Sequence, residues 1–421
     1  MLSKRICGWI IRHKAVGKVI IIELSIGEHV KPAVIVLKKN REPELYEKAK
    51  ELAIGTAICF EGEIAPEQKS KRGIEYLVKN IKIYAEPIEP LPVDTVGKVP
   101  TLLDTRIKYR YLLIRNPAEK ALIRIRSIIL RSARKFFEEN GFLEIHTPKI
   151  VAAGAEGGAT LFPIEYFEYK AYLSQSPQLY KQILMSSIPR VYEITPYFRA
   201  EKFNTTRHLN ESWGIDAEMG FIHSEEDVMR LLEKLVKYIV DKVRTEAREE
   251  LDVLDINVDP LTIPFKRLRF EEAVDILRSE GIEIPEGEDL SESAEKKLGE
   301  IMAEKGYNIY FIVGFPWPAT GFYYMRGEDN YHTRKFDLDY RGLEIASGGQ
   351  REHRYEKLVE ALKLKGLNPK DFSFYLEAFK YGMPPHGGFG LGVERLMMSM
   401  LGLENVRLAT IFVRDRTRLV P

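Results

Sequence analysis

The amino-acid sequence predicts an α+β protein with two domains: a small five-stranded barrel, followed by a larger domain in which helices flank one mostly antiparallel sheet. Short β-rich runs fill the first 85 residues, and a proline-rich segment follows them. Beyond that segment, strand-like runs alternate with long helices that carry one apolar face. With 421 residues, 45% of them hydrophobic, the chain can bury a core in each domain.

The N-terminal domain is expected to span residues 1–85. Its strands are predicted where β-branched and aromatic residues cluster, at residues 6–12, 19–24, 33–37, 56–64 and 76–84. A helix at about residues 42–52 falls between the third and fourth strands, which is where an oligonucleotide-binding (OB) barrel places its helix. We therefore expect an OB-fold barrel, with a small barrel used only for packing as the alternative.

Residues 86–101 are expected to form a linker, because the prolines between residues 86 and 92 forbid a helix and favour an extended chain. The second domain then runs from residue 102 to residue 421. Its first long helix should begin at Pro117 and stop at Gly141.

One sheet should organise this second domain. Its strands are predicted at residues 193–198, 214–221, 336–346 and 388–391. Ser224 and Asp227 are expected to cap a helix that continues to about Leu251. Residues 265–306 are expected to form a small helical insertion.

Charge and cysteine content limit the partners of the chain. Its 63 Lys and Arg residues balance 62 Asp and Glu residues, so a nucleic-acid partner would be bound by local basic surfaces and not by net charge. Cys7 and Cys59 cannot form a disulfide framework or a four-ligand metal site, and we expect both to be buried as small apolar residues. Because no long uncharged apolar run occurs, we expect a cytoplasmic protein with no membrane partner.

A first segment of charged residues suits the binding of a nucleotide. Arg199 and Glu201 end a predicted strand, and Arg207 and His208 follow a polar turn. Guanidinium groups pair with phosphate oxygens, so this pattern favours a triphosphate site. A solvated ladder of salt bridges would give the same pattern.

Two further segments add acidic residues and glycines. Asp337 and Glu344 are seven residues apart, so they can share a metal ion only if the glycine between them bends the chain. Residues 387–395 contain closely spaced glycines, which let a ligand approach the backbone, and they end with Arg395.

In this order the segments resemble the signature motifs of class II aminoacyl-tRNA synthetases, and the resemblance extends from Leu102 to Pro421. The residues that resemble motifs one, two and three are Gly141–Pro148, Phe198–Glu201 and Gly390–Arg395, respectively. Residues 155–160 and 174–181 resemble the aspartyl, asparaginyl and lysyl subgroup, whose members also carry an N-terminal anticodon-binding barrel. The resemblance implies a homodimer, formed through the motif-one helix and strand.

The resemblance also implies a reaction in which ATP activates an amino acid as an aminoacyl-adenylate, which then reacts with tRNA. As catalytic residues, Arg199 would hold the α-phosphate, and Arg395 would stack on adenine and contact the γ-phosphate. Glu201 would recognise the adenine amino group or the acceptor end of tRNA. The other implied ATP-binding residues are Arg207, His208 and Glu344, and the implied ligands of Mg2+ are Asp337, Glu344 and Ser347.

Lys181 indicates aspartate as the amino acid. Aspartyl enzymes carry a lysine at this spacing, and a free carboxylate requires a cation that a carboxamide would leave half satisfied. Arg351 would be the second cation on the substrate side chain, and Gly382–His386 also resembles the archaeal type of aspartyl enzyme. The residues implied to bind the amino acid are Glu156, Gln178, Lys181, Asp216, Ser347 and Arg351.

Three alternatives stay open: an asparaginyl enzyme, a paralogue with another acceptor, and an RNA-binding protein with an inactive second domain. An aspartyl enzyme could charge tRNA-Asp alone or tRNA-Asn as well. Two segments depart from the family. Val19–Ile21 replaces an aromatic platform for an anticodon base, and Thr320-Gly321 stands where a basic residue and proline are expected near the pocket.

Overall fold

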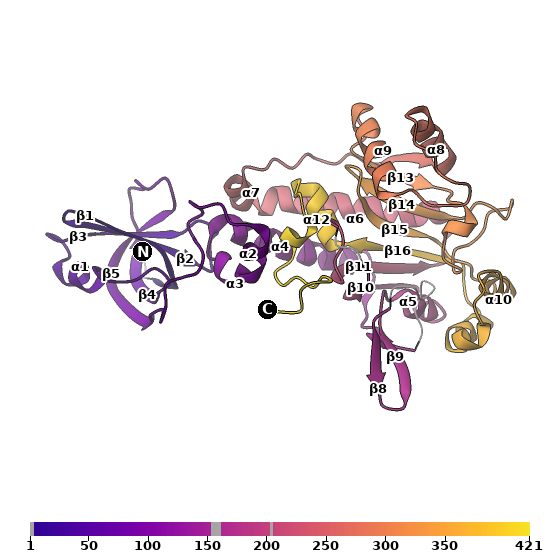
Figure 1. Cartoon of the computed structure of the whole chain (residues 1–421), viewed down its shortest axis with the longest axis horizontal. Coiled ribbons are helices and arrows are strands. Elements are labelled where there is room, and N and C mark those ends of the chain that lie inside the picture. Colours follow the sequence, from indigo (N-terminus) through magenta and orange to yellow (C-terminus); the bar gives the residue numbers. More distant parts are fainter. Residues whose placement is uncertain (1–3, 153–160, 203–204) are drawn as a thin grey trace. The chain divides into compact units, whose positions relative to one another are not determined.

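The computed structural model describes residues 4–152, 161–202 and 205–421 (Figure 1). The chain divides into two compact units. One comprises Met1–Ser127, Arg244–Asn257 and Val420–Pro421, and the other comprises Ile128–Val243 and Val258–Leu419. The boundary at Ser127 lies inside helix α4 (Pro117–Glu139), so the first unit extends beyond the predicted linker at residues 86–101.

The first unit is built on a closed barrel. Its strands are β1 (Lys4–Val16), β2 (Val19–Ile26), β3 (Ala33–Lys38), β4 (Ala57–Ile64) and β5 (Ile74–Ala85). They close in the order β1-β2-β3-β5-β4, and helix α1 (Pro43–Ala49) follows β3 in the chain. Ile20, Ile22 and Leu24 alternate along β2 and are fully buried, as the inward face of a barrel requires. The predicted barrel of the OB type is therefore confirmed.

The cysteines differ from the expectation. Cys7 on β1 lies directly opposite Cys59 on β4, and the two form a disulfide bond. Cys7 is exposed, whereas Cys59 is buried. The expectation that both cysteines are buried as small apolar residues is wrong, because a disulfide depends on strand register, which the spacing of two cysteines along the sequence does not show.

Beyond β5 the predicted linker makes an ordered turn. The carboxylate of Asp94 accepts hydrogen bonds from the backbone amides of Val96, Lys98 and Val99, at 2.8, 2.6 and 3.0 Å. The remaining helices of this unit are α2 (Leu103–Lys108), α3 (Arg110–Leu113), the first part of α4, and α7 (Arg248–Leu254).

The second unit contains an eight-stranded sheet in the order β12-β13-β14-β15-β16-β11-β10-β6. Its strands are β6 (Leu143–Glu144), β10 (Arg190–Phe198), β11 (Glu211–Gly220), β12 (Lys266–Arg269), β13 (Ile309–Val313), β14 (Lys335–Tyr340), β15 (Glu344–Gln350) and β16 (His386–Gly392). Neighbouring strands are antiparallel except at the two edges, where β12 pairs with β13 and β10 pairs with β6. The predicted antiparallel sheet is confirmed, and the strand predicted at residues 336–346 is a hairpin of β14 and β15.

Helices flank this sheet (Figure 1). The longest are α4 and α6 (Glu225–Glu246), and α6 ends before the predicted limit at Leu251. The shorter elements are α5 (Gln178–Leu184), α10 (Tyr355–Leu364), α11 (Ser373–Leu376), α12 (Val393–Leu401), and a small sheet of β7 (Ile150–Val151), β9 (Tyr169–Leu173) and β8 (Pro163–Tyr166). In the described part of the chain, no helix combines the length and the apolar character needed to cross a bilayer.

The predicted insertion shares its core with the main sheet. Its helices are α8 (Phe270–Ser279) and α9 (Glu292–Glu304), which lie side by side next to β13 in Figure 1. Leu277, Leu298 and Tyr310 belong to one buried apolar cluster, which joins both helices to β13. The segment is therefore an extension of the sheet and not a separate appendage.

Helix α9 also contacts the turn between β14 and β15. A Cβ atom at Gly299 would lie 2.2 Å from the Cα atom of Gly342 and 2.5 Å from its nitrogen. Gly342 has a φ of 71°, in the left-handed region that favours glycine. This contact between two backbones places Glu295, one turn earlier in α9, beside the start of β15.

We therefore expect Gly299→Ala to lower the free energy of unfolding, although alanine is the better helix former by about 1 kcal/mol. The added methyl group meets backbone atoms of Gly342 and Arg341, which cannot rotate away as a side chain can, and such overpacking typically costs roughly 1–3 kcal/mol. Chemical denaturation measures the difference. The control is Glu300→Ala, an exposed position on the same helix. Equal stability of the two variants would contradict the close contact.

Candidate active site

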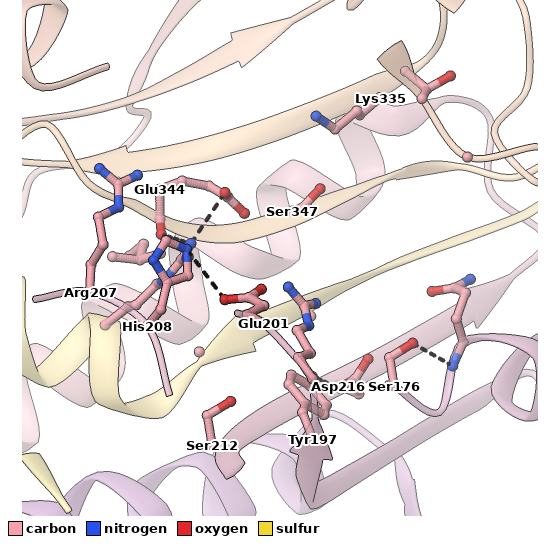
Figure 2. A pocket seen from close by; sticks show the side chains of 18 of the residues that line it. Ser176, Tyr197, Glu201, Arg207, His208, Ser212, Asp216, Lys335, Glu344 and Ser347 are labelled. Carbon is pink, nitrogen blue, oxygen red and sulfur yellow. Dashed lines mark hydrogen bonds and ion pairs between the residues drawn. The ribbon is translucent and has the colours of Figure 1, made fainter. Parts of the chain in front are cut away.

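A cavity of about 440 Å3 opens beside the central strands of the main sheet. In Figure 2, Glu201, Arg207, His208 and Glu344 lie together at one end, and Asp216 lies elsewhere in the cavity. The predicted residues that line this cavity are Gln178, Arg199, Glu201, Arg207, His208, Asp216, Glu344, Ser347, Arg351 and Arg395. Segments far apart in the sequence therefore converge on one site.

Two predicted site residues do not line this cavity, and a third is not among the described residues. Asp337 lines an adjoining cavity of about 220 Å3, together with Glu344 and Arg395. Lys181 is not among the lining residues of the larger cavity, and its side chain is 2% exposed. Glu156 lies outside the described residues.

Arginines dominate one end of the cavity. Arg395, from the first turn of α12, donates through Nη1 to the carbonyl oxygen of Glu344 at 3.0 Å and to its carboxylate at 3.2 Å. Arg207 forms an ion pair with Glu295 of α9. Arg199 follows β10 directly and lines the same cavity. Guanidinium groups in such an arrangement suit the phosphates of a nucleotide.

His208 is neutral among these arginines. Burial lowers its pKa to about 4, and the positive charges of Arg395, Arg207 and Arg199 act in the same direction. Its Nδ1 atom lies 2.7 Å from the hydroxyl oxygen of Thr205. At neutral pH the imidazole can therefore hydrogen-bond to a nucleotide without adding charge.

This shift predicts a loss of stability in mild acid. The unfolded chain protonates His208 near its ordinary pKa of 6.5, whereas the folded chain keeps it neutral down to about pH 4. Neutral His208 therefore makes its full contribution to the free energy of unfolding above the pKa of the unfolded chain. Below that pKa, this contribution declines by about 1.4 kcal/mol per pH unit. His208→Gln cannot titrate, so its unfolding free energy should fall less between roughly pH 7 and 5 in urea denaturation. Parallel pH dependence in the two proteins would contradict the shift.

The β14–β15 hairpin reverses direction at a turn that contains Gly342. This turn brings Asp337 of β14 and Glu344 of β15 to the same adjoining cavity. Asp337 lies opposite Ser347 in the hairpin, and Glu344 begins the second strand. Burial alone would raise the pKa of Glu344, but Arg395 and other nearby cations outweigh burial and lower it. The carboxylate of Glu344 is therefore ionised at the end of the cavity that holds the arginines.

Asp337 is paired with Lys335, whose Nζ donates to Oδ2 at 2.7 Å. Burial raises the pKa of Asp337 to about 7, although Lys335 acts in the opposite direction. Its Oδ1 atom is buried with no hydrogen-bond partner among the described residues. The oxygens of Asp337, Glu344 and Ser347 are of the kind that Mg2+ prefers. Within the described ranges, however, no three His, Cys, Asp or Glu side chains form a group that could hold a metal ion.

Elsewhere at the cavity, two cations meet two carboxylates inside the protein. The Nζ atom of Lys181 lies 2.9 Å from Asp216 Oδ1 and 3.3 Å from Glu218 Oε2. Arg351 donates from Nε to Glu218 Oε1 at 3.2 Å and from Nη2 to Gln178 Oε1 at 3.1 Å. All five side chains belong to buried residues, so the charged groups compensate one another inside the protein.

Lys181 and Arg351 differ in what they offer a substrate. The ammonium group of Lys181 also donates to the carbonyl oxygens of Ala217 and Phe389, at 3.4 and 3.1 Å. Arg351 lines the cavity, and its Nη1 atom has no hydrogen-bond partner in the described part of the chain. Burial would lower the pKa of Arg351, but Glu218, together with Tyr324 and Tyr323, outweighs burial and raises it. Arg351 therefore places a permanent cation in the cavity wall.

Sequence reasoning gave no role to Glu218 and Glu295. Glu218 stands two residues after Asp216 on β11, so both side chains leave the same face of the sheet, and this spacing could have revealed it. No spacing in the sequence indicates a role for Glu295. This residue belongs to the insertion, and only the folded structure brings it to Arg207.

The fold and the motif residues identify the class of protein. The family of class II tRNA synthetases (D, K and N) matches residues 103–416. The chain therefore belongs to the class II tRNA synthetase family, and the resemblance inferred from the motifs is confirmed.

Relatives named as aspartate ligases are similar to the chain over nearly its whole length. The Aspartate--tRNA(Asp) ligase of Pyrococcus abyssi is 48% identical over 420 residues, which cover 99% of this chain and 96% of that protein. The Aspartate--tRNA(Asp/Asn) ligase of Methanopyrus kandleri is 47% identical over 419 residues, with the same coverage of both chains.

Solved structures share the fold of the whole chain. The asparaginyl-tRNA synthetase of Pyrococcus horikoshii, in complex with asparaginyl-adenylate, is 33% identical and has a TM-score of 0.89, covering 100% of this chain and 96% of that one. The aspartyl tRNA synthetase of Entamoeba histolytica is 29% identical, with a TM-score of 0.86 and coverage of 100% and 90%.

Proposed function

We propose that this chain activates aspartate with ATP, as aspartyl-adenylate, and transfers the aspartyl group to tRNA. One observation carries the proposal: Arg351, a permanent cation held by Glu218, lines the same cavity as Arg199 and Arg395. A small acid and a triphosphate can then bind side by side. The similarity to full-length proteins named aspartate ligases supports the same reaction.

In the first step, a carboxylate oxygen of the amino acid forms a bond to the α-phosphorus of ATP while the bond to pyrophosphate breaks. Arg199 neutralises the α-phosphate, and Arg395 stacks on adenine and contacts the γ-phosphate. Arg207 and neutral His208 lie beside the nucleotide, and Glu201 recognises the adenine amino group or the acceptor end of tRNA. The attacking carboxylate is already ionised, so the protein contributes position and charge neutralisation and removes no proton.

Arg351 is proposed to receive the side-chain carboxylate of aspartate. Asp216 and Gln178 would face the ammonium group of the substrate, and Ser347 would contact the amino acid at the β15 wall. Asparagine would present a neutral amide to Arg351 and leave the charge partly unsatisfied, at a cost of about 1–3 kcal/mol.

Lys181 is proposed to hold Asp216 and Glu218 in place, because its ammonium group forms ion pairs with both carboxylates inside the protein. Direct contact between Lys181 and the substrate side chain, expected from the sequence, stays a prediction. The same holds for Glu156 as part of a loop that closes over the amino acid.

We also propose that Asp337, Glu344 and Ser347 hold Mg2+ when ATP binds. When bound, the ion would neutralise part of the negative charge of the phosphates. Asp337 can contribute through Oδ1 while Oδ2 stays with Lys335.

The test of this function is amino-acid-dependent exchange of pyrophosphate into ATP. We expect exchange with aspartate, and about 100-fold less with asparagine, because only the acid neutralises Arg351. Stronger exchange with asparagine would instead favour the asparaginyl alternative. The observation behind this alternative is the similarity to the 33% identical asparaginyl-tRNA synthetase in complex with asparaginyl-adenylate.

A matched pair of variants tests the role of Arg351. Arg351→Lys keeps the charge but removes the planar group that contacts Glu218 and Gln178 together. We expect kcat/KM for aspartate to fall about 100-fold, with ATP binding retained. Arg354→Lys is the control, because Arg354 is half-exposed and pairs with Glu352. An equal effect of both substitutions would count against the assignment.

The second step transfers the aspartyl group to the terminal ribose of tRNA. The names of the relatives differ in their tRNA, Asp alone or Asp and Asn. Charging purified tRNA-Asp and tRNA-Asn separately distinguishes these two types. We propose that the barrel contacts the tRNA without an aromatic platform on β2, where Val19 and Ile21 are half-buried aliphatic residues.

We further propose that the chain forms a homodimer through the motif-one segment. Strand β6 lies at one edge of the main sheet, and Leu143 on it is 54% exposed. An exposed edge strand with an apolar side chain suits an isologous contact with a second copy. Light scattering at micromolar concentration should give twice the mass of one chain. Leu143→Asp should shift the protein toward the monomer, whereas Leu77→Asp, at an equally exposed apolar position on the barrel, should not.

A further inference from the structure

A series of buried hydrogen bonds runs from Arg351 to a histidine that does not line the cavity. Arg351 Nη2 donates to Gln178 Oε1 at 3.1 Å, and Gln178 Nε2 donates to Gln182 Oε1 at 2.8 Å. Gln182 Nε2 lies 3.0 Å from His386 Nε2, and His386 Nδ1 lies 2.8 Å from the carbonyl oxygen of Pro384. Gln182 and His386 are both 0% exposed.

The guanidinium group sets the direction of every bond in this series. Arg351 can only donate, so the carbonyl oxygen of Gln178 must face it, and the NH2 group of Gln178 must face Gln182. Gln182 must then accept through its oxygen and donate through its nitrogen. Nε2 of His386 is therefore an acceptor, and the ring proton resides on Nδ1, which donates to Pro384.

Two further observations agree with this assignment. Burial lowers the pKa of His386 to about 4, so the ring is neutral at physiological pH. The backbone of His386 is also tied to the same arginine, because the amide nitrogen of Arg351 donates to the carbonyl oxygen of His386 at 2.8 Å. A proton on Nε2, or a reversed Gln178 amide, would set two buried donors against each other.

We propose that His386 is a positioning residue for recognition of the amino acid. Through Gln182 it holds the amide of Gln178 in the orientation that presents a carbonyl oxygen to Arg351, so that both side chains keep their places in the cavity wall. This inference rests on the proposed function, in which Gln178 and Arg351 receive aspartate. His386 itself touches no reacting group.

Steady-state pyrophosphate exchange tests this role. His386→Leu removes the acceptor, and we expect KM for aspartate to rise about tenfold or more while KM for ATP changes less than about twofold. His386→Gln places an oxygen near the former Nε2 atom, which can accept from Gln182, and should restore most of the affinity. His223→Leu, at an exposed histidine, is the control. Equal changes in both KM values, or no rescue by glutamine, would overturn the proposal.

The wild-type protein separates this proposal from the proposed function. Absence of aspartate-dependent exchange in the wild type rejects the function, whereas normal exchange with an unchanged KM in His386→Leu rejects only the role of His386. If His386→Leu does not fold, 15N NMR of the wild-type histidines without substrate decides. The signals of His386 are assigned by their absence from the spectrum of His386→Gln. They should show a neutral ring with its proton on Nδ1. A proton on Nε2 would overturn the proposal.

Discussion

The end of the cavity that is proposed to bind the amino acid depends on a buried balance between two cations and two carboxylates. Lys181 and Arg351 would each be costly to bury alone, and so would Asp216 and Glu218. Together they compensate one another within hydrogen-bonding distance. Loss of one member would leave an uncompensated charge, which typically costs about 3–5 kcal/mol. The same groups that stabilise the fold therefore define the cation available to a substrate.

Close packing of strands makes this balance possible. A Cβ atom at Gly388 would lie 2.1 Å from the carbonyl oxygen of Ala217 and 2.2 Å from the carboxylate of Glu218. Glycine on β16 thus gives Glu218 the space to reach both cations. The glycine-rich segment, which the sequence associated with ligand approach, serves here to admit a charged side chain of the neighbouring strand.

Much of the fold follows from periodicity and motif order, as the five barrel strands and the antiparallel sheet show. Of the thirteen site residues that the sequence predicted, ten line one cavity. What the sequence could not provide is register and tertiary contact. The pairing of Cys7 with Cys59 depends on strand alignment, and the position of Lys181 behind the wall depends on which carboxylates surround it. Neither can be derived from the spacing of residues along the chain.

The insertion contributes more than its helical composition suggested. Glu295 of α9 pairs with Arg207 and accepts a hydrogen bond from the backbone amide of Glu344 at 3.2 Å. A chimaera that exchanges the segment between β12 and β13 would leave every signature motif intact, yet it would change the electrostatic potential around the proposed triphosphate site. Such an exchange is therefore expected to alter the affinity for the nucleotide. To keep that affinity, the replacement segment must place an acidic residue at the helix turn that Glu295 occupies.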